Sequence, residues 1–108
     1  QRVEQVWIII INNAMDELMK IDQFEDRRLD INITKDDNKI IIKFKDNAGG
    51  IKDEIVDHLF EPFKGTKKSS GMGVGLSIAK KIIDDQSDAT IEAYNEDKGA
   101  VFKVTLTN

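Results

Sequence analysis

A short acidic and glycine-rich run, Asp46-Asn47-Ala48-Gly49-Gly50-Ile51, carries the first recognisable chemistry in this chain. It follows a segment of alternating apolar residues, so Asp46 is expected at the end of a strand. A carboxylate beside an apolar pocket accepts a hydrogen bond from an exocyclic amine such as that of adenine, which is worth about 1.5–3 kcal/mol. The alternative is an ordinary turn, because Asp, Asn and Gly are frequent turn residues.

Three alternate glycines, Gly71, Gly73 and Gly75, open a helical segment further along the chain. Their spacing is not that of a dinucleotide-binding fingerprint, and no Lys-Ser/Thr pair follows them as in a P-loop. Glycines at the start of a helix still let the backbone approach an anion, and the N–H groups there carry the positive end of the helix dipole. The motif predicts either a phosphate-binding loop or a flexible loop that ends in a tight turn.

Asn13 lies in an apolar helical segment beside Ile10, Ile11 and Ala14. Asn is a weak helix former, and a partly buried amide needs polar partners. Its side-chain oxygen is the hard type of ligand that Mg²⁺ binds. The alternative is an asparagine that bends the helix or is satisfied within the core. Asn12, one position further round the helix, is expected in solvent.

The elements that must position these residues can be read from hydrophobic periodicity. We expect helices over 2–20, 53–60 and 74–86, strands over 29–33, 40–44, 89–94 and 100–106, and a loop over 61–73. Asp53 is expected to cap the second helix, and turns are expected around Asp37 and Lys98. The isoleucines at 8–11 predict a first helix that is buried on more than one face. This order favours an α+β fold, a two-layer α/β sandwich with a mixed, mostly antiparallel sheet and helices on one face.

Composition and length predict one globular domain, residues 1–108. The chain begins at Gln1, so we expect it to be excised from a longer protein. Of the 108 residues, 40% are hydrophobic and 33% are charged, and none is cysteine. Disulfides, thiolate metal sites and cysteine nucleophiles are therefore excluded. The net charge of −4 argues against nucleic acid as the main partner. The longest apolar run is too short for a bilayer. The lack of cysteine suits a cytoplasmic domain, with or without a membrane anchor in its parent protein.

Taken together, these residues resemble the ATP-binding catalytic domain of sensor histidine kinases, within the superfamily of gyrase, heat-shock chaperone and mismatch-repair ATPases. The resemblance spans the whole chain and implies a Bergerat-type ATP-binding fold. The segments that carry it resemble the N box (Gln5 to Leu18), the first glycine box (Asp46 to Ile51), the F box of histidine kinases (Leu59 to Phe63), the second glycine box (Gly71 to Leu76) and the closing motif (Gly99 to Phe102).

The resemblance implies a role for each site residue. Asn13 would hold the Mg²⁺ that bridges the ATP phosphates, and Asp46 would bind the adenine amino group. Gly50 would let the base approach, and Ile51 and Leu76 would line its pocket. The phosphates would lie against Gly71, Gly73 and Gly75. A lid over residues 61–71 would supply a phosphate contact from Lys67 or from its neighbours Lys64 and Lys68, for which the alternative is a solvated loop.

The implied activity is that of a histidine protein kinase in two-component signal transduction. The domain would bind MgATP and donate its γ-phosphoryl group to a histidine on a separate dimeric helical domain, from which it passes to a response regulator. Neither nucleic acid nor the membrane is an implied contact of this domain. The phosphoacceptor lies outside this chain, because the lone histidine, His58, precedes Phe60 in the short helix and is expected to be structural or to face solvent.

Three positions depart from the family pattern. Ile9 stands where the family usually has a polar residue, on the same helix face as Asn13, and an isoleucine offers no lone pair to a metal or a proton. Asp16 stands where many histidine kinases carry a lysine, and Ala48 replaces a common glycine. These departures keep open a degenerate nucleotide-binding or scaffold domain with little or no phosphoryl transfer. An ATP-hydrolysing or serine-kinase branch of the superfamily is a further alternative, against which the Phe60-Glu61-Pro62-Phe63 segment argues.

Overall fold

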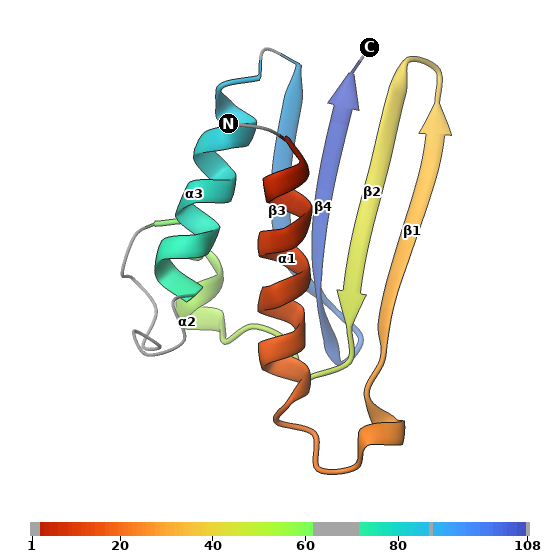
Figure 1. Ribbon diagram of the computed structural model, residues 1–108, viewed down its shortest axis with the longest axis vertical. Coiled ribbons are helices and arrows are strands. Elements are labelled where there is room, and N and C mark those ends of the chain that lie inside the picture. Colours follow the sequence, from red (N-terminus) through yellow and green to blue (C-terminus); the bar gives the residue numbers. More distant parts are fainter. Residues whose placement is uncertain (1–2, 62–71, 87, 108) are drawn as a thin grey trace.

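The computed structural model describes residues 3–61, 72–86 and 88–107 (Figure 1). Two long helices and a four-stranded sheet make up most of this part of the chain. The elements in chain order are α1 (Val3–Leu18), the 3-10 helix η1 (Phe24–Asp26), β1 (Leu29–Asp36), β2 (Lys39–Asp46), α2 (Asp53–Val56), α3 (Met72–Asp84), β3 (Ala89–Glu96) and β4 (Gly99–Thr107). None of the described helices has the length and hydropathy that crossing a membrane requires.

The sheet has the strand order β1-β2-β4-β3, and each of its three pairings is antiparallel. Two hairpins, β1–β2 and β3–β4, are therefore joined along β2 and β4. Each hairpin turns at an aspartate with φ of 56°, Asp37 in the first and Asp97 in the second. Short polar side chains tolerate this left-handed conformation. The expected hairpins and the α+β class are confirmed, and the strands run further than expected because the pairing continues to Asp46 and Thr107.

Helices α1 and α3 pack against each other and cover one face of the sheet (Figure 1). Their buried faces follow from apolar residues spaced three or four apart. Trp7 of α1 stacks on Phe44 of β2, with ring centroids 5.9 Å apart. The fully buried side chains that form the centre of the core are Val6, Ile10, Leu76, Ile82, Ile83, Phe102 and Val104. The predicted two-layer sandwich is therefore confirmed.

Several expected boundaries are wrong by a few residues. The second helix ends at Val56, and turns replace the predicted helix over 57–60. Its N-cap is Lys52, which makes no side-chain cap bond, so Asp53 is the first helical residue. The third helix already begins at Met72, which puts Gly73 and Gly75 inside its first turn rather than Gly73 in the preceding loop. Of the four isoleucines in α1, Ile8 is 58% exposed, while the next three contact the core.

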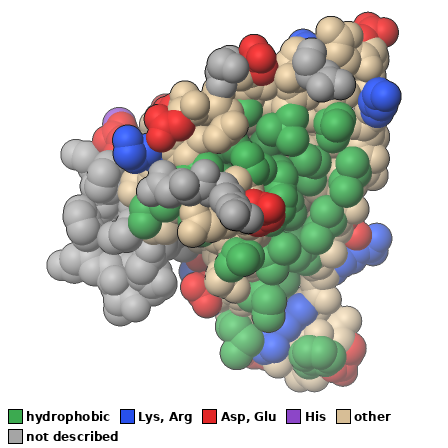
Figure 2. All heavy atoms as spheres, turned by 45° about the horizontal axis from the view of Figure 1, so that its top comes forward, with side chains coloured by type: hydrophobic (Ala, Val, Ile, Leu, Met, Phe, Trp, Pro, Cys, Tyr) green, Lys and Arg blue, Asp and Glu red, His purple; other side chains and the backbone are tan. Residues whose placement is uncertain are grey.

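The edge strand β1 lies beyond the cover of the helices. Ile31 and Ile33 pair with Phe44 and Ile42 of β2 and so lie on the helix-bearing face of the sheet. They are nevertheless 49% and 68% exposed. Together with Ile40 they form what we call the β1 strip. Figure 2 shows how hydrophobic side chains gather in a broad patch on one face of the molecule.

Candidate functional site

Asp46 ends β2 as a buried carboxylate with only 3% of its surface exposed. Its Oδ1 accepts a hydrogen bond from the backbone N–H of Ala48 at 2.9 Å, and the N–H of Ala100 lies 3.4 Å from the same oxygen. Oδ2 has no hydrogen bond within the described residues. The carboxylate is therefore fixed through one oxygen, and the other is left to accept a bond from a ligand.

The loop that follows Asp46 is tied to two separate parts of the chain. The Asn47 side chain accepts a hydrogen bond from the N–H of Arg28 at 2.9 Å and donates one to the carbonyl of Asp26 at 2.8 Å. The N–H of Gly49 donates to the carbonyl of Lys98 at 2.8 Å. These bonds anchor the first half of the loop to the segment before β1 and to the β3–β4 turn.

The second half of the loop is held from β3. Asn95 Oδ1 accepts a hydrogen bond from the N–H of Ile51 at 2.6 Å, and Asn95 Nδ2 donates to the carbonyl of Ile51 at 2.8 Å. Gly50 has φ of +87°, and a Cβ built there would lie 2.8 Å from Asn95 Oδ1. In this structure the space that Gly50 leaves is therefore filled by Asn95.

Asn13 lies on the buried face of α1, with 9% of its surface exposed. Its Oδ1 is buried and has no hydrogen-bond partner in the described structure. An unsatisfied buried acceptor costs about 1–3 kcal/mol. The alternative of an asparagine satisfied within the core therefore fails for this oxygen, while Asn12 is exposed as expected. An orphaned amide oxygen fits the demand of a hard metal ion for an oxygen ligand.

Gly75 of α3 faces α1 at close range. A Cβ built at Gly75 would lie 3.5 Å from Cγ2 of Ile9, which is an ordinary van der Waals contact. The next residue, Leu76, is fully buried in the core cluster against which Ile51 and Ile9 also pack. Two of the expected base-pocket residues thus belong to one cluster, and Ile9 stands beside a glycine of the expected phosphate cradle.

Of the other residues singled out in the sequence, some lie in the described structure and others do not. Gly73 lies in α3, whereas Gly71 and the lysines Lys64, Lys67 and Lys68 lie outside the described residues, as does the end of the expected F box. Asp16 is exposed on α1, one turn after Asn13. His58 is also exposed, and its Nδ1 lies 2.9 Å from Oε2 of Glu61. The expectation of a solvent-facing or structural histidine is thereby met.

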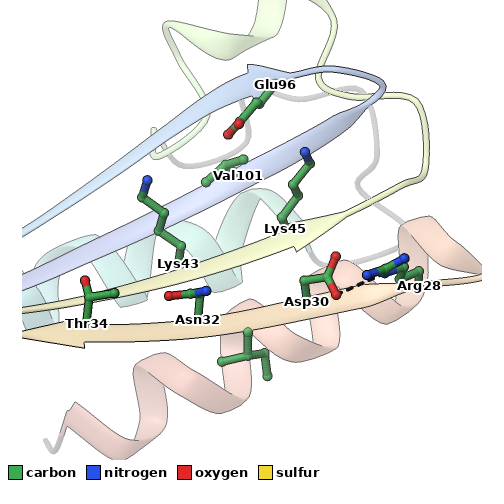
Figure 3. Close-up of a pocket in the computed structure, with 9 residues that line it drawn as sticks. Arg28, Asp30, Asn32, Thr34, Lys43, Lys45, Glu96 and Val101 are labelled. Atoms are coloured by element: carbon green, nitrogen blue, oxygen red, sulfur yellow. Dashed lines mark hydrogen bonds and ion pairs between the residues drawn. The ribbon is translucent and has the colours of Figure 1, made fainter.

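A hollow of about 520 Å³ lies on the opposite, helix-free side of the sheet (Figure 3). It is lined by Lys43, Lys45, Glu96 and neighbouring residues of β1, and by none of the predicted site residues. Within it Arg28 pairs with Asp30 at 3.0 Å. Beside it Lys45 pairs with Asp97 at 2.8 Å. This hydrogen bond raises the pKa of Lys45 and lowers the pKa of Asp97.

Comparison with known proteins identifies the chain. All of residues 1–108 match the family described as histidine kinase-, DNA gyrase B- and HSP90-like ATPase. The chain belongs to this family.

Two of the relatives similar to this chain are sensor proteins. The chain is 34% identical over 105 residues to the C4-dicarboxylate transport sensor protein DctB of Rhizobium meliloti, and 32% identical over 106 residues to the sensor protein FixL of Bradyrhizobium diazoefficiens. Each alignment covers 97% of this chain but only 16% of DctB and 20% of FixL. The chain therefore spans about a sixth to a fifth of the length of these relatives.

Solved structures give the same result for the fold. The catalytic domain of histidine kinase ThkA superposes with a TM-score of 0.73 at 26% identity, covering 96% of this chain and 66% of that one. Membership of this ATPase family makes ATP the ligand to test at Asp46. Within the described residues no cluster of three or more His, Cys, Asp or Glu could hold a metal ion.

Two residues that hold the site in place are absent from our sequence-based prediction. Asn47 enters that prediction only as part of a turn or of the first glycine box, and Asn95 lies one residue beyond the strand expected over 89–94. A usable signal existed for Asn95, because Asn is depleted in strands, so its presence near the end of β3 calls for a local partner. Nothing in the sequence indicated that the partner would be Ile51, which precedes it by 44 positions.

Proposed function

We propose that residues 1–108 form the ATP-binding catalytic domain of a sensor histidine kinase. In this proposal the domain binds MgATP and presents the γ-phosphoryl group to a histidine on a separate dimeric helical domain of the same kinase. The group then passes to a response regulator. Phosphoryl transfer depends mainly on positioning and charge neutralisation, so a site with few polar side chains is sufficient. The domain would act in the cytoplasm.

The observation that carries the proposal is the state of the Asp46 carboxylate. It is buried, one oxygen is held by backbone N–H groups, and the other has no partner within the described residues. A buried acceptor of this kind gains most from a donor that arrives with a ligand. The adenine amino group is such a donor, and Ile51 and Leu76 of the adjoining core cluster would provide the apolar walls of its pocket.

The phosphate end of the site would lie between α1 and the start of α3. Asn13 offers its unpartnered oxygen there as a ligand for Mg²⁺. Gly71, Gly73 and Gly75 would bring backbone N–H groups close to the phosphates, as helix N-termini do for anions. Lys67 would complete the phosphate contacts from the lid. When bound, Mg²⁺ would neutralise phosphate charge.

Calorimetric titration with ATP, with and without Mg²⁺, tests the proposal. We expect Mg²⁺-dependent binding to the wild-type domain and a loss of about 10- to 100-fold in Asp46→Asn, since the charged hydrogen bond is worth about 1.5–3 kcal/mol. Asp36→Asn, at an exposed position on the sheet, is the matched control and should bind as the wild type does. Absence of binding at millimolar ATP would refute the proposal.

Transfer itself needs a second experiment. The domain is mixed with radiolabelled ATP and the dimeric helical domain of its parent kinase, and label on the helical domain is followed over time. We expect label to appear with the wild-type domain and to be absent with Asp46→Asn. Label released only as inorganic phosphate would favour an ATP-hydrolysing function instead.

One observation favours a second candidate, a domain that binds nucleotide but transfers little phosphate. Ile9 packs against the core, and a Cβ built at Gly75 would lie 3.5 Å from its Cγ2. An apolar side chain therefore occupies the helix position one turn before Asn13. Ile9→Asn discriminates between the candidates, because a marked gain in transfer rate at unchanged ATP affinity would identify Ile9 as the cause of a degenerate site.

A further inference from the structure

Asn95 is the residue through which β3 holds the loop that follows Asp46. Its side-chain amide exchanges two hydrogen bonds with the backbone of one residue, Ile51, at 2.6 and 2.8 Å. This pattern is the one by which two directly opposed residues pair in an antiparallel sheet. Asn95 thus fixes both the N–H and the carbonyl of Ile51, as a neighbouring strand would.

Among the described residues, Asn95 supplies all the hydrogen bonds that hold the backbone of this half of the loop. Within the described part of the chain, the two bonds to Asn95 are the only hydrogen bonds made by the backbone of Gly50 and Ile51. Two consecutive glycines precede Ile51, with φ of 98° and 87°. Glycine loses more conformational freedom on ordering than any other residue. Without Asn95, this stretch would have little to select one conformation.

The shapes of Asn95 and Gly50 match. A Cβ built at Gly50 would come within 2.8 Å of Asn95 Oδ1 and within 3.6 Å of the Gly99 carbonyl oxygen. The amide of Asn95 therefore lies where any side chain at position 50 would have to go. Ile51 in turn packs its side chain against the core cluster that contains Leu76. The path from β3 to the predicted base pocket is thus a continuous set of contacts.

We propose that Asn95 is a positioning residue of the nucleotide site, which preorganises Ile51 as the wall of the base pocket. The inference rests on the proposed function, because it assigns the base pocket to Ile51. A preformed wall spares the ligand the cost of ordering the loop, so losing it weakens binding of the base. Ordering one residue changes an equilibrium by a factor of about 10, and we expect Asn95→Ala to weaken ATP binding by about that factor.

The test separates the base end of the site from its phosphate end. Wild type, Asn95→Ala and Asn32→Ala are titrated with Mg²⁺ and either ATP or inorganic triphosphate. Asn32 is an exposed asparagine of β1 whose side chain makes no hydrogen bond to the other described residues, and it serves as the matched control. We expect Asn95→Ala to lose affinity for ATP and to keep its affinity for triphosphate. Equal losses for both ligands, or no loss for either, would overturn the proposal.

Amide hydrogen exchange without nucleotide supplies a readout that does not depend on binding. We expect the Ile51 amide to exchange at least about 10-fold faster in Asn95→Ala than in wild type, with core amides unchanged. An unchanged Ile51 rate would overturn the positioning role. If the wild type binds no ATP, the proposed function fails and this inference fails with it. If Asp46→Asn loses ATP affinity while Asn95→Ala does not, only this inference fails.

Discussion

Gly99 lies directly against the backbone carbonyl of Asp46, at the point where β4 begins and β2 ends. A Cβ built at Gly99 would overlap the carbonyl oxygen of Asp46 and come within 2.8 Å of its carbonyl carbon. These atoms belong to the backbone and cannot rotate away. The closing glycine of the chain and the candidate adenine-binding carboxylate are therefore parts of one steric unit.

Replacing Gly99 by alanine should destabilise the domain strongly. The two strands would have to separate locally, and we expect a loss of about 3 kcal/mol or more in the free energy of unfolding. Urea denaturation measures it. Gly49→Ala is the control. A Cβ built at Gly49 would have no atom within 4 Å, and only its φ of +98° is unfavourable for alanine. Its cost should be confined to backbone strain of about 1–3 kcal/mol. A Gly99→Ala variant as stable as wild type would contradict the steric relationship.

Gly75→Ala should separate stability from function. Its new Cβ would meet Ile9 Cγ2 at an unstrained 3.5 Å, and alanine in a helix is favoured over glycine by about 1 kcal/mol. We expect a higher melting temperature together with weaker ATP binding, because the methyl group would stand where the phosphates approach. Thermal unfolding and calorimetry measure the two effects. A variant that binds ATP normally would remove Gly75 from the phosphate site.

Asn13→Leu should stabilise the nucleotide-free domain while removing its response to Mg²⁺. The variant replaces an unpartnered buried oxygen by an apolar group of similar size, which is neutral or favourable by about 1 kcal/mol. We expect ATP affinity to become independent of Mg²⁺. Asn12→Leu, at an exposed position, should keep the wild-type response. A large loss of stability in Asn13→Leu would indicate that Asn13 has a structural role.

The Lys45–Asp97 ion pair should make a small, pH-dependent contribution to stability. The bond to Lys45 lowers the pKa of Asp97, so this contribution is present above the usual aspartate range and is lost as pH falls through it. The pKa of Lys45 is raised, so the contribution is also lost at strongly alkaline pH. NMR titration of the Asp97 carboxyl should show its pKa returning to the ordinary value in Lys45→Met. An unshifted value would show that the pair does not persist in solution.

The β1 strip should limit the solubility of the isolated domain. Ile31 and Ile33 are exposed on an edge strand, and exposed apolar edge strands promote association. We expect Ile33→Thr to raise the concentration at which the domain aggregates, at a cost in stability below about 1 kcal/mol. Light scattering at increasing concentration, with urea denaturation alongside, tests this. Unchanged aggregation would show that the strip is not the associating surface.

Local patterns predicted the elements well. Alternating apolar residues located both hairpins, and the turn aspartates Asp37 and Asp97 adopt the conformation that their residue type favours. The helix boundaries were less certain, because Asp53 looks like an N-cap although it lies one residue inside α2. A cap depends on backbone angles that residue type alone does not specify.

The candidate binding residues could be predicted from the sequence, but the residues that hold them in place by hydrogen bonds could not. Asp46 is recognisable from its position between a strand and two glycines. The bonds from Asn95 to Ile51 join residues 44 positions apart, and those of Asn47 reach back to Asp26 and Arg28. Such pairings follow from strand order and register, which periodicity does not determine. In the described structure Asn13 Oδ1 has no hydrogen-bond partner. This too depends on the packing of distant side chains, which the local sequence does not reveal.

From the pairing of β2 with β4 we also expect a definite order in which the chain folds. Each hairpin closes a short loop, whereas β2 and β4 join residues about 60 positions apart, which costs more entropy and takes longer. Asp46 acquires its neighbours Gly99 and Ala100 only in this late step. We therefore expect the adenine end of the site to be the last part of the sheet to form, because a β1–β2 hairpin folded alone contains Asp46 without Gly99 and Ala100. If nucleotide is present during refolding, the onset of its binding should coincide with the pairing of β2 with β4.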